Sequence, residues 1–369
     1  MDTDFEIFLV ALPGLEPWLA AEARAAGFAG VSEQPGGVAL RGGWAEAMRA
    51  NLSLRGAVRV LLRFASFRAM HLAQLDKRAR KVDWAAVLRP DVPVKVEAVC
   101  RASRIYHHKA AAQRIGRAIT ETLGAPLSEE AELRILARID DDLCTLSIDT
   151  SGEPLHRRGH KEAVGKAPLR ETMAAMFLAE CGFDGSQTVV DPMCGSGTFV
   201  LEAAEIAAGL MPGRSRAFAF EQLATFDPAA WAALKQPAPA RTPDLRFHGS
   251  DRDQGAVSSA RANAARAGVA DWCRFECHAV SAAEPPPGPP GLVMVNPPYG
   301  ARIGDRKLLF GLYGALGGVL KERFRGWRLG MVTSDSGLAK ATGLAFLDPG
   351  PPVAHGGLKV TLWRTAPLP

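Results

Sequence analysis

Hydrophobic and polar positions along the first 155 residues follow two periods. Apolar residues at every second position are typical of strands, and apolar residues spaced three and four apart are typical of amphipathic helices. The pattern predicts strands over 5–12, 36–42, 58–67, 92–100 and 143–152, and helices over 14–28, 44–54 and 109–124. Gly27 is expected to stop the first of these helices. The order predicts a small α+β region made of two subdomains.

From about residue 171 the pattern changes to a regular alternation of helix and strand. Helices are predicted over 170–183, 198–209, 255–268 and 308–324, and strands over 187–193, 245–251, 273–280, 292–298, 328–334 and 358–364. Such alternation predicts an α/β domain with a parallel, doubly wound sheet. Residues 211–244 are predicted to be an insertion after a helix, and the proline-rich stretch 282–291 a stiff connector.

Composition narrows the class of protein. The chain has 369 residues, enough for two or three compact units, and its 47% hydrophobic content is that of a soluble globular protein. Its first residues carry acids where a signal peptide is basic, and no apolar run approaches the roughly 20 residues that a membrane helix needs. We expect a cytoplasmic monomer with no membrane partner.

The six cysteines are scattered and show no paired CxxC spacing, so we expect neither a disulfide framework nor a metal site. The segment "CRFECHAV" resembles a metal-ligand cluster at first sight. However, it alternates like a strand, which would place Cys273, Phe275 and Cys277 on one buried face.

The charge distribution favours a nucleic-acid partner. The formal net charge is +5, and three basic segments, 63–81, 100–117 and 156–170, all precede residue 171. A single basic run is usually a solvated face, but three on one side of the chain are a stronger indication. The candidate RNA-binding residues are Arg101, Arg104, Lys109, Arg157 and Arg158.

Ligands of doubly wound sheets bind beyond the carboxyl ends of the strands. In "VVDPMCGSGTFVLEAA" a strand ends at Asp191, a glycine turn follows, and a helix opens near Thr198. A nicotinamide fingerprint would need glycine at Val200, and a P-loop would need Gly-Lys-Ser/Thr, so both are excluded. An acid before the turn repels a pyrophosphate but suits the cationic amino-acid end of S-adenosylmethionine; the alternative is a plain tight turn. The candidate cofactor residues here are Asp191, Pro192, Cys194, Gly195, Gly197 and Thr198.

The second strand end, "LRFHGSDRD", offers a carboxylate for the two ribose hydroxyls of a nucleoside. Asp251 is the better placed candidate and Asp253 the alternative, although Asp253 could instead cap the next helix. The distance along the chain from Asp191 is long for a βαβ unit, so the insertion 211–244 must account for it.

The third strand end is "LVMVNPPYGARIG". Two adjacent prolines cannot donate ladder hydrogen bonds, so the strand must stop there. The Asn296 side-chain oxygen and the Pro297 carbonyl can both accept from an exocyclic amine, and Tyr299 can stack on the base that carries it. We predict a catalytic motif made of Asn296, Pro297, Pro298 and Tyr299, with Asn296 also bordering the cofactor. The alternative is a simple strand-ending turn.

Nearly the whole chain resembles the class I S-adenosylmethionine-dependent RNA methyltransferases that carry a THUMP domain, and among them the N-terminal half of the bacterial large-subunit rRNA guanine-N2 methyltransferases. The resemblance rests on "LHRRGHKEAVGKAPLRETMAA", "DPMCGSGTFVLEAA", "GSDRD" and "NPPYGARIG". It implies a ferredoxin-like subdomain over 1–55, a THUMP domain over 56–155, and a Rossmann-like methyltransferase domain with a seven-stranded, mostly parallel sheet over 156–369.

The resemblance also implies S-adenosylmethionine as cofactor and places Ala167, Pro168, Leu169 and Glu171 near it. One departure is Ala279, which stands where the family usually carries an acid that contacts the adenine. That contact would then come from Ser281 or from a backbone N–H. Some relatives add a second methyltransferase after this one; a chain that ends at Pro369 is expected to make a single type of methyl mark.

The expected activity is direct methyl transfer to the N2 amine of a guanosine in 23S rRNA, with RNA as partner and no metal. Guanine in tRNA is the first alternative. Adenine-N6 or cytosine-N4 amines, DNA included, and a protein glutamine use a similar motif, but give no reason for the basic N-terminal half. A non-catalytic RNA-binding or ribosome-assembly factor is the alternative from another class.

Overall fold

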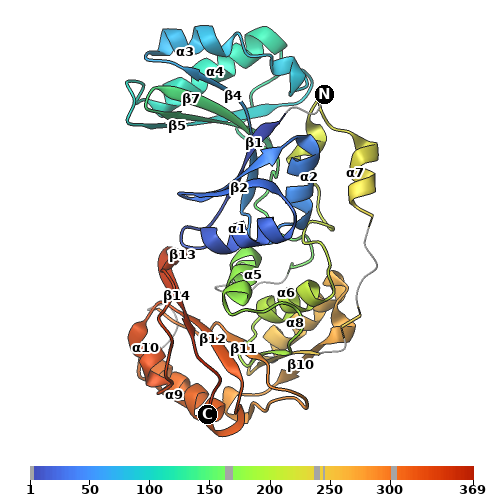
Figure 1. Cartoon of the computed structure of the whole chain (residues 1–369), viewed down its shortest axis with the longest axis vertical. Helices are drawn as coiled ribbons and strands as arrows, with labels where there is room; N and C mark the ends of the chain where they lie inside the picture. Colours follow the sequence, from blue (N-terminus) through green and yellow to red (C-terminus); the bar gives the residue numbers. More distant parts are fainter. Residues whose placement is uncertain (1–3, 163–168, 237–241, 244–245, 301–305) are drawn as a thin grey trace. The chain divides into compact units, whose positions relative to one another are not determined.

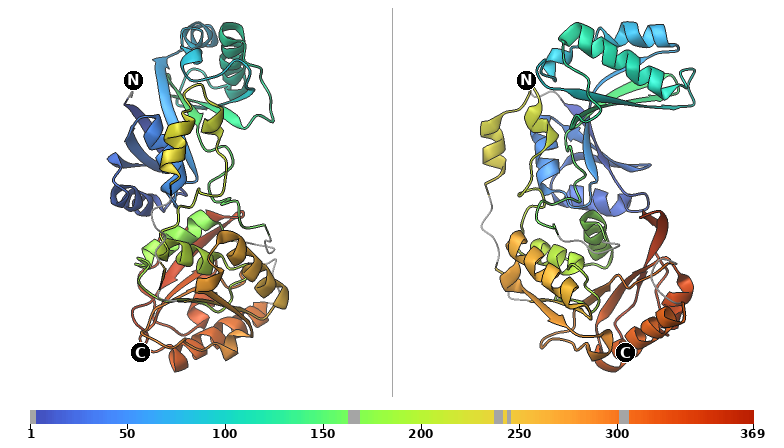
Figure 2. Two further views of the ribbon diagram at one scale, coloured as in Figure 1. Left: turned by 90° about the vertical axis from the view of Figure 1, so that its right-hand side faces the viewer. Right: turned by 180° about the vertical axis from the view of Figure 1, so that it is seen from behind.

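The computed structural model describes residues 4–162, 169–236, 242–243, 246–300 and 306–369 (Figures 1 and 2). The chain separates into two compact units. The first comprises Met1–Ala11, Ala20–Leu155 and Arg216–Gln236, and the second Leu12–Leu19, His156–Ser215 and Pro237–Pro369. The predicted α+β region and the predicted α/β region are both confirmed. The boundaries proposed for the three domains stay a prediction.

One mixed sheet organises the first unit. Within the described residues it has seven strands in the order β2-β3-β1-β4-β7-β6-β5. The strands are β1 (Phe5–Val10), β2 (Ala29–Gln34), β3 (Gly37–Gly42), β4 (Arg59–Arg68), β5 (Val94–Arg101), β6 (Leu133–Asp140) and β7 (Leu143–Asp149). β5 and β6 are parallel and the other pairs antiparallel. The ten-residue strand β4 joins the two halves, because residues 59–63 pair with β1 and residues 61–68 pair with β7.

The helices of this part of the chain are α1 (Glu16–Ala25), α2 (Trp44–Ser53), α3 (Leu72–Ala79), the short η1 (Trp84–Ala86) and α4 (His108–Leu123). Helices α3 and α4 lie side by side on one face of the sheet, and α4 packs on β5 (Figure 1). Sequence reasoning missed β2, β6 and α3. The polar edge strand β2 has few apolar residues and so gives little indication of a strand. In β6, by contrast, Leu133, Ile135 and Ile139 are buried at every second position, a pattern that predicts a strand.

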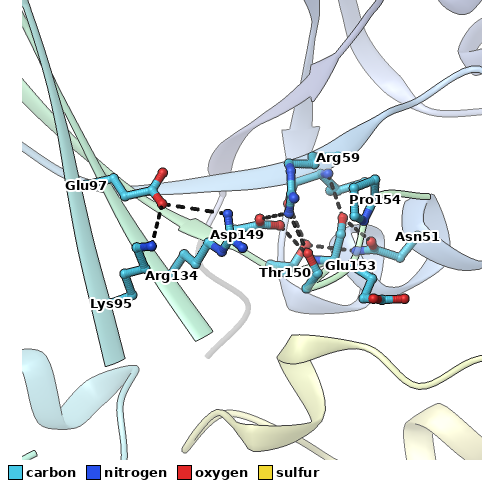
Figure 3. Close-up of polar contacts among 12 residues, drawn as sticks. Asn51, Arg59, Lys95, Glu97, Arg134, Asp149, Thr150, Glu153 and Pro154 are labelled. Carbon is cyan, nitrogen blue, oxygen red and sulfur yellow. Dashed lines mark hydrogen bonds and ion pairs between the residues drawn. The ribbon is translucent and has the colours of Figure 1, made fainter. Parts of the chain in front are cut away.

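A polar network holds the end of β7 and the segment that leaves it (Figure 3). Asn51 Nδ2 donates to Thr150 Oγ1 at 2.8 Å, Ser151 Oγ donates to Asn51 Oδ1 at 2.7 Å, and Arg59 pairs with the buried Asp149. Within the same unit, Arg216 donates to the backbone carbonyls of Ser151, Glu153 and Pro154.

The predicted insertion therefore has a structural role. Residues 216–236 form η2 (Ala219–Gln222) and α7 (Pro228–Leu234), belong to the first unit, and pack on α2. The chain leaves the second unit after α6 (Thr198–Ala207) and returns to it before β9 (Phe247–Asp251). This excursion explains why α6 and β9 are far apart in sequence although they belong to one βαβ unit, in which β8 and β9 are neighbouring parallel strands.

The sheet of the second unit is mostly parallel, as predicted. In the part of the chain that the structure describes, its seven strands run in the order β10-β9-β8-β11-β12-β14-β13. The strands besides β9 are β8 (Val189–Asp191), β10 (Cys273–Cys277), β11 (Leu292–Val295), β12 (Arg328–Thr333), β13 (Val353–His355) and β14 (Leu358–Arg364). β14 runs antiparallel to β12 and to β13.

Helices cover both faces of this sheet (Figure 1). They are α5 (Glu171–Glu180), α6, α8 (Gln254–Ala267), α9 (Arg306–Arg323) and α10 (Ser336–Ala341), with the short η3 (Ala270–Trp272) and η4 (Val280–Ala282). On one face, Val293, Val295 and Met331 pack against buried residues of α9 such as Tyr313 and Leu316. Apolar burial on both faces explains why the central strands read as continuous hydrophobic runs.

No helix within the described residues is long and apolar enough to cross a membrane.

Candidate active site

Three side chains predicted from strand ends lie at one edge of the second unit's sheet. Asp191 is the last residue of β8, Asp251 the last of β9, and Asn296 directly follows β11. These strands are parallel neighbours in the order β9-β8-β11, so their carboxyl ends meet at the same edge. The structure therefore brings the three groups together, and their roles remain predictions.

The glycine turn after β8 has the close packing that its sequence indicates. Gly195 and Gly197 have φ angles of +52° and +89°, a region that favours glycine. A Cβ atom on Gly197 would lie 2.7 Å from the Leu201 side chain. Helix α6 begins at Thr198 with no side-chain cap, so its first N–H groups face the turn without a capping oxygen. An anionic or carboxylate group is favoured at such a helix end.

Asp191 is 2% exposed, and burial raises the pKa of its carboxyl well above the ordinary value. The backbone N–H of Met193 donates to Asp191 Oδ1 at 3.1 Å and opposes that rise, whereas the nearby Asp251 adds to it. A cationic ligand group would stabilise the ionised form of this carboxyl.

Asp251 holds the glycine turn from the neighbouring strand. Its Oδ2 accepts from the Gly195 N–H at 3.0 Å, and its Oδ1 accepts from the Asp253 N–H at 2.9 Å. Asp253 is the N-cap of α8 and accepts from the Gly255 N–H at 2.7 Å. The alternative weighed from sequence, that Asp253 caps a helix, is confirmed, and this leaves Asp251 as the candidate for the ribose.

The side chain of Asn296 has an unusual environment. Its Oδ1 is buried and accepts no hydrogen bond from any residue that the structure describes. A buried acceptor without a donor costs roughly 1–3 kcal/mol, so few such atoms persist in native proteins without a reason. The side-chain oxygen Oδ1 of Asn296 is thus suited to accept a hydrogen bond from an N–H group of a bound molecule.

The residues after Asn296 are fixed by the domain core. The phenol oxygen of Tyr313, on α9, lies 3.3 Å from the Pro298 carbonyl oxygen and 3.2 Å from Thr333 Oγ1. Tyr299 is half-buried against the hydrophobic core, and burial raises its pKa to about 12. The phenol of Tyr299 is therefore neutral at physiological pH. The contact between Tyr313 and Pro298 was not predicted from the sequence.

Lys161 is a second residue that sequence reasoning missed. Its ammonium lies 3.0 Å from Glu171 Oε1 and donates to Thr198 Oγ1 at 2.7 Å, and its side chain is 7% exposed. It thereby links two predicted cofactor residues, the first of α5 and the first of α6. The basic segment around it was interpreted as an RNA surface, which hid this role. Leu169 is buried and its carbonyl also faces Lys161, while Ala167 and Pro168 lie outside the described residues.

The predicted RNA-binding residues divide into exposed and buried ones. Arg101, Arg104 and Lys109 of the first unit and Arg157 of the second are exposed. Arg158, by contrast, is 2% exposed and pairs with the equally buried Glu202 of α6 at 3.3 Å. This burial argues against the predicted RNA contact of Arg158, because a phosphate could reach the guanidinium only if the ion pair opened.

The adenine contact predicted for Ser281 or a nearby backbone N–H stays a prediction. Ser281 is exposed in η4, and its backbone carbonyl accepts from Arg323; Ala279 is also exposed. Pro192 and Cys194 are buried in the glycine turn, where burial raises the pKa of the Cys194 thiol.

The predicted buried face of β10 is wrong in part. Phe275 is buried, but Cys273 is half-buried and Cys277 exposed, because β10 is the edge strand of its sheet. Among the described residues, no group of three or more His, Cys, Asp and Glu side chains is arranged to hold a metal ion.

Family models match three successive parts of the chain. Residues 158–348 match the model described as RMKL-like, methyltransferase domain; residues 6–61 match the RlmL ferredoxin-like domain, and residues 69–149 the THUMP domain. These matches define the class of the protein as a methyltransferase with ferredoxin-like and THUMP regions. The chain belongs to the RMKL-like methyltransferase family.

Relatives of known name agree with this assignment. The chain is 33% identical to slr0064 of Synechocystis sp., named as an RNA methyltransferase, with 97% of this chain and 95% of the relative covered. It is 36% identical to ribosomal RNA large subunit methyltransferase K/L of Syntrophotalea carbinolica, over 93% of this chain and 51% of the relative. The chain thus spans about half the length of the K/L relatives that it matches.

Solved structures show the same fold over the whole chain. SMU.472, a methyltransferase complexed with SAH, has a TM-score of 0.89 at 26% identity and covers 100% of both chains. A methylase from Clostridium difficile 630 has a TM-score of 0.88 at 28% identity, with 100% of this chain and 99% of the other covered.

Proposed function

We propose that this protein transfers a methyl group from S-adenosylmethionine to the N2 amine of a guanosine in 23S rRNA. The observation that carries the proposal is the buried Asn296 Oδ1, which lacks a donor among the described residues. An exocyclic amine has two N–H groups to offer, and the Asn296 side chain and Pro297 carbonyl follow each other at the end of β11.

The cofactor supplies a methyl group activated on a sulfonium centre. Asp191 would attract its cationic amino-acid end, and the ionised carboxyl would then be stabilised despite its burial. Asp251 would accept the ribose hydroxyls with the lone pairs that Gly195 and Asp253 leave available. Glu171 and Thr198, joined through Lys161, would form the wall beside the methionine part.

The catalytic motif would act by holding the amine in line with the methyl group. Positioning of two reactants in this way accounts for a large part of the rate of many enzymes. Asn296 and Pro297 would accept from the amine, which withdraws its lone pair from the ring, and Tyr299 would stack on the base. The base reaches such a pocket by leaving its stack in the RNA.

The substrate class rests on the family and on the relatives' names. The K/L relatives are named for the large-subunit ribosomal RNA, and the THUMP-matching region carries the exposed cations Arg101, Arg104 and Lys109. These would bind phosphates and the shape of folded RNA rather than its sequence.

The direct test compares a strain that lacks this gene with its parent. Ribosomal and transfer RNA are digested separately to nucleosides, and methylated guanosines are quantified by mass spectrometry. Loss of N2-methylguanosine from the large-subunit rRNA would support the proposal, and loss from tRNA would favour a tRNA substrate. If both pools are unchanged, the proposal is wrong, and another amine, a protein substrate or a non-catalytic role must be considered.

A variant separates binding from chemistry. Asn296→Ala should lower methyl transfer at least a hundredfold, as is typical for removal of a positioned hydrogen-bond partner, while SAH affinity changes little. Methyl transfer within twofold of the parent enzyme would show that Asn296 does not hold the amine.

A further inference from the structure

The loop between β5 and α4 of the first unit presents the ring of Tyr106 to solvent. Tyr106 is 83% exposed, more than any other large hydrophobic residue that the structure describes as exposed. The residue before it, Ile105, is 3% exposed and anchors the loop in the core of the unit. The tyrosine is therefore held at the surface by its neighbour.

Hydrogen bonds fix the start of this loop. Ser103 Oγ donates to the Arg101 carbonyl at 2.7 Å, the Arg104 N–H donates to Asp142 Oδ1 at 2.8 Å, and the Asp142 N–H donates to Ser103 Oγ at 3.0 Å. Ala102 has a φ angle of +43°, a conformation that costs free energy in a residue with a Cβ atom. Such strain persists where the surrounding structure enforces it, so the loop has one well-defined path.

The end of the loop is equally ordered. His107 is the N-cap of α4, where its Nδ1 accepts from the Ala110 N–H at 3.1 Å. The rings of His107 and His108 are stacked, with centroids 6.2 Å apart and an interplanar angle of 23°. Tyr106 thus lies between two fixed points, Ile105 and the first turn of α4.

The chain segment around Tyr106 is cationic, and the acids next to it come from the β6–β7 turn: Asp142 accepts from the Arg104 N–H, and Asp140 is in register with Arg101. Residues 100–117 contain no acid, and the exposed Arg101 and Lys109 precede and follow the tyrosine along the chain. Arg104 is the less available cation, because its guanidinium lies 3.8 Å from the Asp142 carboxylate. A fixed aromatic ring flanked by cations is complementary to an unpaired nucleotide, whose base has a flat face and whose phosphates are anionic.

We propose that Tyr106 is a stacking platform for an unpaired nucleotide of the substrate RNA, with Arg101 and Lys109 holding the adjacent phosphates. This proposal deepens the proposed function and rests on its RNA substrate. Paired bases have no free face for the ring, so the site selects RNA with a single-stranded or bulged nucleotide. Because the loop is already ordered, little conformational entropy is lost when the base stacks.

The test measures binding of the full-length protein to two labelled RNA oligonucleotides by fluorescence anisotropy, one single-stranded and one the fully paired duplex of the same sequence. Tyr106→Ala should weaken binding to the single strand about tenfold and hardly change binding to the duplex. Tyr106→Phe keeps the ring and should retain the affinity. Leu127→Ala, which truncates another exposed apolar residue of the same unit, is the matched control and should bind like the parent protein.

Salt dependence distinguishes stacking from charge. Tyr106→Ala should lower affinity at every salt concentration with an unchanged slope of log K against log salt, whereas Arg101→Ala and Lys109→Ala should reduce the slope. The proposal is overturned if Tyr106→Ala binds the single strand within twofold of the parent, or if both RNAs lose affinity equally.

Methyl transfer to cellular RNA is measured separately with the parent enzyme. If no methyl group is transferred, the proposed function fails, while the anisotropy series still decides whether Tyr106 stacks on an unpaired base.

Discussion

The phenol of Tyr313 lies 3.3 Å from the carbonyl oxygen of Pro298, and the tyrosine is completely buried. This contact connects helix α9 to the motif that follows β11. Because Thr333 Oγ1 is the second neighbour of the same phenol at 3.2 Å, the motif is tied to β12 as well. The position of the predicted catalytic motif is thus set by the core of the domain.

Tyr313→Phe should lower kcat about tenfold and leave SAH affinity within twofold. Phenylalanine fills the same space, so the loss of stability should stay near the roughly 1 kcal/mol of one hydrogen bond. Steady-state kinetics, calorimetric SAH binding and thermal unfolding measure the three quantities. Thr333→Val is the matched control, because it removes one neighbour of the phenol and keeps the contact with Pro298. Equal losses of kcat in both variants would contradict a specific role of the Pro298 contact.

Lys161 and Glu171 should be energetically coupled. Lys161→Met leaves the carboxylate of Glu171 buried without its ammonium partner, so we expect lower stability and weaker SAH binding. The double variant with Glu171→Gln should recover part of both losses. A double-mutant cycle on thermal stability and SAH affinity measures this coupling, expected at about 1–3 kcal/mol. Additive effects would mean that the ion pair does not organise the cofactor wall.

SAH affinity should rise with pH through the titration of Asp191. Burial raises the pKa of this carboxyl in the free protein, so a part of the molecules must release a proton before a cationic amino group can pair with it. Affinity therefore increases as the pH rises through the raised pKa of Asp191, until the amino group of SAH itself begins to lose its proton. Calorimetry in two buffers of different ionisation enthalpy would detect the released proton. Asp191→Asn should bind weakly with a flat profile; an unchanged profile in that variant would assign the proton to another group.

His156 should make folding pH-dependent. Burial, reinforced by nearby cations including Arg170 and Arg157, lowers its pKa from 6.5 to about 4. Between these values the unfolded chain binds a proton that the folded chain does not, so its contribution to the free energy of unfolding is complete above 6.5 and is lost as pH falls toward 4. Melting temperatures over this range should fall more steeply for the parent protein than for His156→Gln. Parallel curves would contradict the assignment.

Arg157 and Arg158 should have opposite phenotypes although they are adjacent. Arg158→Met breaks a buried pair with Glu202 and should cost about 3–5 kcal/mol of stability while leaving the salt slope of RNA binding unchanged. Arg157→Ala concerns an exposed side chain and should change that slope rather than the melting temperature. Unfolding curves and anisotropy titrations at several salt concentrations compare the two. A reduced slope for folded Arg158→Met would restore its predicted RNA contact.

Much of the second unit could be predicted from sequence because its signals are local. The strands β8 and β11 are short apolar runs with abrupt ends, β9 ends at an aspartate, and parallel strands must present their carboxyl ends at one edge. That rule places Asp191, Asp251 and Asn296 at one edge of the sheet, and the strand order β9-β8-β11 makes them neighbours. The glycines of the turn were predictable because glycine, which has no Cβ atom, adopts positive φ angles readily.

Other features depend on tertiary contacts and could not be obtained from patterns. Charge gives a residue's chemistry but not its partner, so Arg158 and Lys161 looked like surface cations until the fold placed Glu202 and Glu171 against them. The edge strands β2 and β10 are partly exposed to solvent, which weakens the alternation of apolar and polar residues along them. For the same reason Cys277 is exposed, although the sequence pattern predicted that it would be buried. The return of residues 216–236 to the first unit is likewise decided by long-range packing.

The sequence by itself thus determined most of the order of elements in the second unit, the ends of its central strands and the candidate site residues at those ends, because these follow from local periodicity and backbone preferences. Tertiary structure decided which polar groups are buried, which are paired and which, like Asn296 Oδ1, lack a partner among the described residues. Burial and pairing depend on residues that are distant in the chain. The free energy of burying a charge or an amide is therefore set by its neighbours in the fold and cannot be obtained from its position in the sequence.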